Sequence, residues 1–171
     1  MSVQELEFIA AENQEQLLAI HNLAPVLWKY AYKDILSMEQ IEYMLDWMYS
    51  MPTLEKSSAN GTKFFLIEIN GVNQGFIALT PDGENPSLIM LDKLYLHRDY
   101  HGQGVGQKSL DFACEYAKIN GFEQIQLHVN KNNQRGQKAY LRNGFVITNE
   151  VVTDIGNNFV MDDYLMTKEI I

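Results

Sequence analysis

The stretch LDKLYLHRDYHGQGVGQKSL, residues 91–110, decides the fold. Its first half belongs to a predicted strand and its second half opens an amphipathic helix. Glycines at positions 102, 104 and 106 lie at the junction. They free the backbone there, so successive N–H groups can point outward at the positive end of the helix dipole. The stretch therefore predicts either a phosphate-binding loop or a loop that merely needs positive φ.

Two nucleotide motifs do not fit these glycines. A Walker A loop and a dinucleotide fingerprint that begin at Gly102 both need glycine at position 107, where Gln107 stands. A fingerprint that begins at Gly104 meets Ser109 instead. A phosphate held by this loop is therefore not expected to belong to either kind of nucleotide site.

Working outward from this stretch, hydrophobic periodicity and turn signals predict the other elements. Four helices are expected. The first spans residues 13–32, and the second begins at Ser37 and ends at Met51-Pro52. The third ends at Gly121, and the fourth spans residues 133–143 and ends at Gly144. The expected strands are residues 3–9, 63–69, 72–79, 88–97, 124–129, 145–153 and 159–168. The pattern predicts a mixed α/β or α+β fold with two strand–helix units in its second half.

Composition sets limits on function. The chain has 171 residues, is 46% hydrophobic and carries a net charge of −9, so one domain over residues 1–171 with a real core is expected, and a general nucleic-acid surface is not. The lone Cys114 cannot form an intramolecular disulfide. No apolar run reaches the ~20 residues of a membrane span, and no targeting segment is evident. A soluble, cytoplasmic protein is the expectation.

The charge is unevenly distributed along the chain. Residues 93–142 carry eight basic and four acidic side chains, a net +4, whereas the remainder carries −13. A basic segment within an acidic protein is expected where one phosphorylated cofactor binds.

Two motifs together resemble a known family. The strand KLYLH, then His101 and GQGVGQKSL, and some thirty residues later NNQRGQKAYLRNGF, are similar to the GNAT superfamily of acyl-CoA-dependent N-acetyltransferases. The resemblance implies about seven mostly antiparallel strands with splayed central parallel strands, and about four helices. It also implies acetyl-CoA as cosubstrate, no metal, and direct acetyl transfer to a primary amine.

The family's loop, (Gln/Arg)-x-x-Gly-x-(Gly/Ala), is matched by His101, Gly104 and Gly106. His101 departs from the usual Gln or Arg, and a neutral imidazole would weaken a side-chain contact near the pyrophosphate. Gly136 stands for the alanine of the second motif, a small-for-small change. The cofactor-binding residues that the resemblance implies are Leu94, Tyr95 and Leu96 through their backbones, the loop His101, Gly102, Gln103, Gly104, Val105, Gly106 and Gln107, and then Asn133, Gly136 and Tyr140.

The resemblance also suggests catalytic roles. Tyr140 stands where the family places its general acid beside the sulfur; a core tyrosine is the alternative. Many members have a glutamate at the position of Asp92, which makes Asp92 a candidate base, acting directly or through water; an ordinary solvated carboxylate is the alternative. Strand alternation predicts that Asp92 shares a face with Met90 and Leu94.

Other side chains have less specific interpretations. Trp28 and Tyr32, like Tyr43 and Trp47, are spaced to pack in a core or to form an aromatic wall for a cationic acceptor. Asp162 and Asp163 are expected on an exposed strand edge; an acceptor pocket is the alternative. The histidines His97, His101 and His128 are expected to be solvated or hydrogen-bonded rather than to bind a metal, because no cysteine or carboxylate cluster completes a site.

The expected acceptor is a small-molecule amine such as a diamine or polyamine, because residues 28–45 and 162–170 are broadly similar to bacterial enzymes of that kind. Acetylation of a protein N-terminus or lysine stays open, as does a non-catalytic acyl-CoA-binding module. Neither nucleic acid nor a membrane is an expected partner. Because the family is often dimeric through its C-terminal strands, a homodimer is also an expectation.

Overall fold

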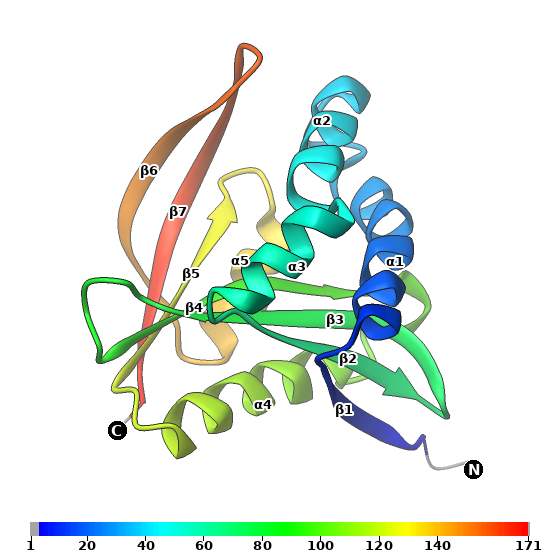
Figure 1. Ribbon diagram of the computed structural model, residues 1–171. Coiled ribbons are helices and arrows are strands. Elements are labelled where there is room, and N and C mark those ends of the chain that lie inside the picture. Colours follow the sequence, from blue (N-terminus) through cyan, green and yellow to red (C-terminus); the bar gives the residue numbers. More distant parts are fainter. Residues whose placement is uncertain (1–3, 171) are drawn as a thin grey trace.

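A seven-stranded sheet forms the centre of the protein (Figure 1). The structure, a computed structural model, describes residues 4–170. Its helices are α1 (Gln14–Tyr32), α2 (Met38–Tyr49), α3 (Met51–Ala59), α4 (Val105–Ile119) and α5 (Gln134–Arg142), with a 3₁₀ turn at Arg98–Tyr100. Its strands are β1 (Leu6–Ala11), β2 (Lys63–Ile69), β3 (Val72–Pro81), β4 (Leu88–Leu96), β5 (Gln124–Asn130), β6 (Val146–Gly156) and β7 (Phe159–Glu169).

The strand order is β1-β2-β3-β4-β5-β7-β6, and every pair is antiparallel except β4 with β5. The predicted mixed fold with seven mostly antiparallel strands is confirmed. Val3, the start of the predicted first strand, lies outside the described residues. No helix within residues 4–170 is both long and apolar enough to cross a membrane.

One helix was missed by the sequence prediction. Met51-Pro52 does end the second helix, but α3 begins at the same place. Ser50 adopts an extended conformation and its hydroxyl accepts a hydrogen bond from the Thr53 N–H at 3.4 Å, which caps α3. Pro52 is tolerated because a proline in the first turn lacks only an N–H that would have no partner within the helix. The described residues therefore contain five α-helices rather than about four.

Two hydrophobic cores cover the two faces of the sheet. Helix α4 packs on one face, over side chains such as Ile77 and Ile125. Helices α1 to α3 cover the other face, over side chains such as Phe76 and Ala78. Figure 1 shows α4 on the opposite side of β3 from α1 and α3.

The parallel pair at the centre is short. β4 and β5 pair only from Leu88 with Gln124 to Met90 with Gln126, and beyond this point the two strands separate (Figure 1). The expected splay of the central strands is therefore present, and it opens the sheet from its middle toward the carboxyl ends of both strands.

A β-bulge changes the faces of β4. Lys93 pairs with Ala78 and Leu91 pairs with Leu79, which leaves Asp92 as the extra residue. Leu94 consequently packs against the α4-side core together with Leu91. The prediction that Asp92 and Leu94 share a face is wrong, because simple alternation does not hold across the bulge.

The expectation of an exposed edge is wrong for Asp163. β7 lies between β5 and β6, so it is an interior strand, and Asp163 is only 6% exposed. Its neighbour Asp162 does lie on the surface, where its carboxylate pairs with the Lys131 ammonium at 2.8 Å.

Candidate active site

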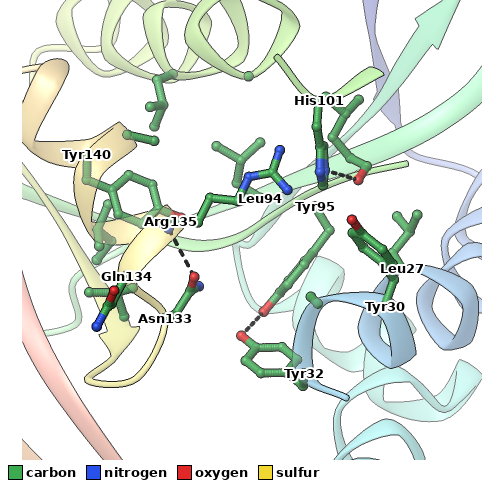
Figure 2. Close-up of a pocket in the computed structure, with 18 of the residues that line it drawn as sticks. Leu27, Tyr30, Tyr32, Leu94, Tyr95, His101, Asn133, Gln134, Arg135 and Tyr140 are labelled. Atoms are coloured by element: carbon green, nitrogen blue, oxygen red, sulfur yellow. Dashed lines mark hydrogen bonds between the residues drawn. The ribbon is translucent and has the colours of Figure 1, made fainter. Parts of the chain in front are cut away.

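A cavity of about 890 Å³ opens where β4 and β5 part, bounded by α1, α5 and the glycine loop (Figure 2). Most residues that the sequence singled out line it: Tyr32, Asp92, Leu94, Tyr95, Leu96, His101, Gly102, Gly104, Gly106, Gln107, Asn133, Gly136 and Tyr140. Gln103, Val105 and Trp28 do not. Residues far apart in the sequence therefore meet at the gap in the sheet.

The glycine loop presents free backbone donors to this cavity. Gly102 and Gly104 have φ values of 75° and 83°, which side chains other than glycine rarely adopt. Gly104 is the N-cap of α4 and supplies no side-chain hydrogen bond, so the first N–H groups of α4 stay available at the positive end of its dipole. The phosphate-binding interpretation fits this geometry.

Two residues of the loop point elsewhere. Gln103 is exposed, and its side-chain amide donates to the Asp99 carbonyl at 2.7 Å. Val105 is buried in the core beneath α4. The side chains of Gln103 and Val105 therefore anchor the loop and do not face the cavity.

His101 holds the end of β4. The carbonyl oxygen of Leu96 lies 2.8 Å from its Nε2, and because a carbonyl can only accept, Nε2 carries the proton. Desolvation lowers the pKa of His101, although the bond to Leu96 opposes this. The imidazole is therefore neutral near pH 7, and its buried Nδ1 has no hydrogen-bond partner among residues 4–170.

Arg135 supplies the positive charge that a neutral His101 lacks. Its guanidinium reaches from α5 toward His101 across the cavity (Figure 2), and its charge contributes to the lowered pKa of that histidine. Arg142 and Lys33 also line the cavity. Sequence reasoning did not single out Arg135 as a site residue, although the basic segment 93–142 contains it.

The free edge of β4 faces the gap through alternate residues. The His97 N–H donates to Gln74 on β3 at 2.7 Å, whereas the Leu96 carbonyl points away from β3 toward His101. Because backbone groups alternate between the two edges of a strand, Leu94 and Leu96 face the gap and Tyr95 faces β3. The expected backbone role of Tyr95 is corrected: Tyr95 contributes its side chain to the cavity instead.

Three tyrosines meet at the cavity. The hydroxyls of Tyr32 and Tyr95 lie 2.9 Å apart. A dashed line marks this hydrogen bond in Figure 2. Burial raises the pKa of Tyr32 to about 12 and raises that of Tyr140 further. Tyr140, opposite them on α5, therefore stays protonated and can donate a hydrogen bond at any ordinary pH.

Asn133 caps α5 rather than pointing freely into the cavity. Its side-chain oxygen accepts from the Gly136 N–H at 3.0 Å. A Cβ built on Gly136 would lie 2.7 Å from the Asn133 side-chain nitrogen. Alanine at position 136 would therefore disturb this cap, so glycine here is more than a small-for-small change.

Trp28 packs in the core. It is 1% exposed, and its indole N–H donates to the Tyr49 hydroxyl at 2.8 Å. The acceptor contact suggested for Trp28 is therefore corrected to a packing role, whereas its helical neighbour Tyr32 does line the cavity. Tyr43 and Trp47 lie away from the cavity lining; the Tyr43 hydroxyl donates to Ile155 in the β6–β7 hairpin.

A carboxylate and a histidine mark the other end of the cavity. Asp92 is open to the cavity, accepts a hydrogen bond from Thr80, and has its pKa raised by desolvation, against the opposing effect of Thr80. His128 on β5 also lines the cavity, and its charge acts on Asp92. The sequence predicted only a solvated or hydrogen-bonded His128, because the pairing of β4 with β5, which brings it to the cavity, could not be read from one sequence.

No metal site accompanies these groups in the described part of the chain. Residues 4–170 contain no cluster of three histidine, cysteine or carboxylate side chains placed to hold an ion. His97 instead accepts from the Asp99 N–H at 3.2 Å.

The loop geometry makes a prediction about Gly104 and Gly106. Gly104→Ala is expected to lower Tm by about 2–8 °C and to weaken coenzyme A binding, because a side chain at φ 83° costs roughly 1–2 kcal/mol. Gly106→Ala is the control for stability, since Gly106 has an ordinary φ and open space around its Cβ position. Thermal melts and calorimetric titration check both variants; equal Tm values would contradict the strain argument.

Comparison with known proteins gives the family. The Acetyltransferase (GNAT) family model matches residues 17–145. The chain is 29% identical over 163 residues to a spermidine N(1)-acetyltransferase of Thermoplasma acidophilum, covering 92% of this chain and 95% of that protein.

Solved structures agree with this match. The PaiA N-acetyltransferase of Thermoplasma acidophilum, solved in complex with coenzyme A, superposes with a TM-score of 0.80 at 25% identity, over 98% of this chain and 99% of that one. A GCN5-related N-acetyltransferase of Rhodopseudomonas palustris shares the fold, with a TM-score of 0.78 at 21% identity over 99% and 97% of the two chains. With the family model matched over most of its length, the chain belongs to the acetyltransferase (GNAT) family.

Proposed function

We propose that this member of the family transfers an acetyl group from acetyl-CoA to a primary amine of a small polyamine or diamine. One observation carries the proposal: a single cavity joins an anion-binding loop to an acidic end through the gap between β4 and β5. The loop suits a pyrophosphate, and the acidic end suits a cationic amine.

The residues present fit acetyl-CoA. The free N–H groups at the start of α4 and the Arg135 guanidinium would hold phosphates. The Leu94 backbone at the open edge of β4 would pair with the pantetheine arm as an added strand. The bound thioester would supply an activated acetyl group; everything else in the reaction falls to side chains of the chain.

Protons must then move at both the nitrogen and the sulfur. An alkyl ammonium with a pKa near 10.4 is neutral in only about one molecule in a thousand at pH 7, so a base must take its proton. Asp92, with its raised pKa, is suited to accept it, directly or through water. Tyr140 would protonate the departing sulfur, because its hydroxyl is buried and stays protonated.

A polyamine acceptor is supported by two comparisons. The Thermoplasma relative is named a spermidine N(1)-acetyltransferase. A spermidine N-acetyltransferase chimera from Vibrio cholerae has the same fold, with a TM-score of 0.70 at 21% identity over 99% of this chain and 96% of that one. The carboxylates Asp34 and Asp92 line the cavity, in keeping with a cationic acceptor.

An amine panel tests this function. Release of the coenzyme A thiol is measured with spermidine, spermine, diamines, monoamines, amino acids and lysine peptides. We expect the highest kcat/KM for acceptors with two or more ammonium groups. A preference for peptides would indicate a protein acetyltransferase. Coenzyme A binding without thiol release for any amine would indicate a non-catalytic module, and either result would contradict the proposal.

A further inference from the structure

Three titratable side chains form a row across the sheet where β4 and β5 part. Asp92 and His128 each stand two residues beyond the last paired residues of their strands, Met90 and Gln126, so they face each other across the gap. Asp163 on β7 lies on the other side of His128. It pairs with Asn130, two residues along β5, and diagonal neighbours of this kind lie about 7–8 Å apart.

The three side chains differ in their access to the cavity. His128 is exposed and lines the cavity. Asp163 is buried behind it, 6% exposed, and its Oδ1 has no hydrogen-bond partner among the described residues. A buried carboxylate oxygen without a partner costs stability. A positive charge on His128 would compensate for that cost.

Both carboxylates interact with His128. Desolvation raises the pKa of Asp92 and of Asp163, and in both cases His128 acts in the opposite direction. Two other cations also act on these carboxylates: Lys93 acts on Asp92 ahead of His128, and Lys131 acts on Asp163. The Lys131 ammonium is held by Asp162 at 2.8 Å and by Glu150 at 3.2 Å, and Lys93 lies over the Tyr49 ring.

The tyrosines of the helices that pack on the same face of the sheet as His128 add no negative charge near it. The titratable tyrosines there have raised pKa values because they are buried: Tyr32, at about 12, and Tyr49. An imidazolium formed at His128 would therefore be flanked by two carboxylates, one on each neighbouring strand, and by neutral phenols.

We propose that His128 accepts the proton of the acceptor ammonium, coupled to Asp92 across the gap, and that Asp163 is a positioning residue that stabilises the resulting imidazolium. The inference rests on the proposed function. The proton moves from the ammonium to an unprotonated imidazole nitrogen. The freed lone pair forms the new C–N bond as the C–S bond breaks, and Tyr140 protonates the sulfur. The second proton that the nitrogen loses restores the Tyr140 hydroxyl through water. Because His128 is exposed, it then returns its proton to water in the cavity.

His128→Gln tests the catalytic part. At saturating spermidine and neutral pH, kcat is expected to fall about a hundredfold, with acetyl-CoA affinity unchanged. The acidic limb of the plot of kcat against pH should be abolished or displaced, because it reports Asp92 and His128 together. In His128→Ala, added imidazole should restore part of kcat. Wild-type protein with imidazole alone measures any acetylation of imidazole itself.

Asp163→Asn tests the positioning part. We expect a smaller fall in kcat and an acidic limb displaced to lower pH, because the imidazolium loses one stabilising charge. Tm at neutral pH should rise by a few degrees, because an unpartnered buried carboxylate is removed. Asp162→Asn, which changes the adjacent exposed carboxylate, is the matched control and should leave the limb in place.

The outcomes distinguish a failure of this inference from a failure of the proposed function. An active wild type whose His128→Gln variant keeps both kcat and the acidic limb would overturn the role of His128 and leave the acetyltransferase proposal intact. An unmoved limb in Asp163→Asn would overturn the role of Asp163. A wild type inactive with every amine would overturn the proposed function and this inference together.

Discussion

Tyr140→Phe is expected to lower kcat about a hundredfold while leaving acetyl-CoA affinity unchanged. The hydroxyl of Tyr140 lies in the cavity wall, and burial raises its pKa far enough to keep it protonated throughout the working pH range. Its loss removes the proton donor for the sulfur but leaves the ring, which packs edge-on against Phe145. General acid catalysis of this kind contributes about 10²–10⁴-fold.

The control for this variant is Tyr116→Phe. Tyr116 lies on α4, where its ring packs against Phe65 outside the cavity lining. It should keep wild-type kcat. Steady-state thiol release and calorimetry separate turnover from cofactor binding. Full activity in Tyr140→Phe would remove Tyr140 from the mechanism, and weakened acetyl-CoA binding with normal kcat would make it a binding residue only.

Asp92→Asn is expected to lower kcat by tenfold or more and to abolish or displace the acidic limb of the kcat profile. Desolvation raises the pKa of this carboxyl, so the limb should lie above the ordinary value near 3.9. The carboxylate form is the active one, and activity is therefore lost as the pH falls through the raised pKa. Because Asp92 and His128 interact, the limb reports the pair rather than one residue.

Thr80→Val sharpens the test of Asp92. The Thr80 hydroxyl donates a hydrogen bond to the Asp92 carboxylate, which lowers its pKa. Removing that bond should move the acidic limb to higher pH while preserving kcat at alkaline pH. Rate profiles of the two variants at saturating amine check this. An Asp92→Asn profile with an unchanged acidic limb would exclude Asp92 as a proton acceptor.

Local sequence signals predicted most of the elements because each is encoded by neighbouring residues. Gly121 and Gly144, which were expected to close two helices, have the left-handed φ values of 83° and 101°. The α3 helix was missed because Pro52 also suits the first turn of a new helix, and only the extended Ser50 shows that a helix begins there.

The resemblance pointed to Asp92, but the surroundings of Asp92 at the acidic end could not be predicted from the sequence, for a different reason. The bulge that places Asp92 depends on the register of β3 with β4. The burial of Asp163 depends on β6 lying outside β7. Neither relation has a local signature. The cofactor end was easier to predict, because the glycine loop and the second motif are each continuous in the chain.

The most direct test of the account follows the acetyl group itself. Purified protein is incubated with acetyl-CoA labelled in its acetyl group and with spermidine, and the products are resolved by mass spectrometry alongside free thiol. The account predicts labelled N-acetylspermidine, formed in equal amount to the released coenzyme A. Thiol released with the label recovered only as acetate, or no labelled amine while coenzyme A binds, would contradict it.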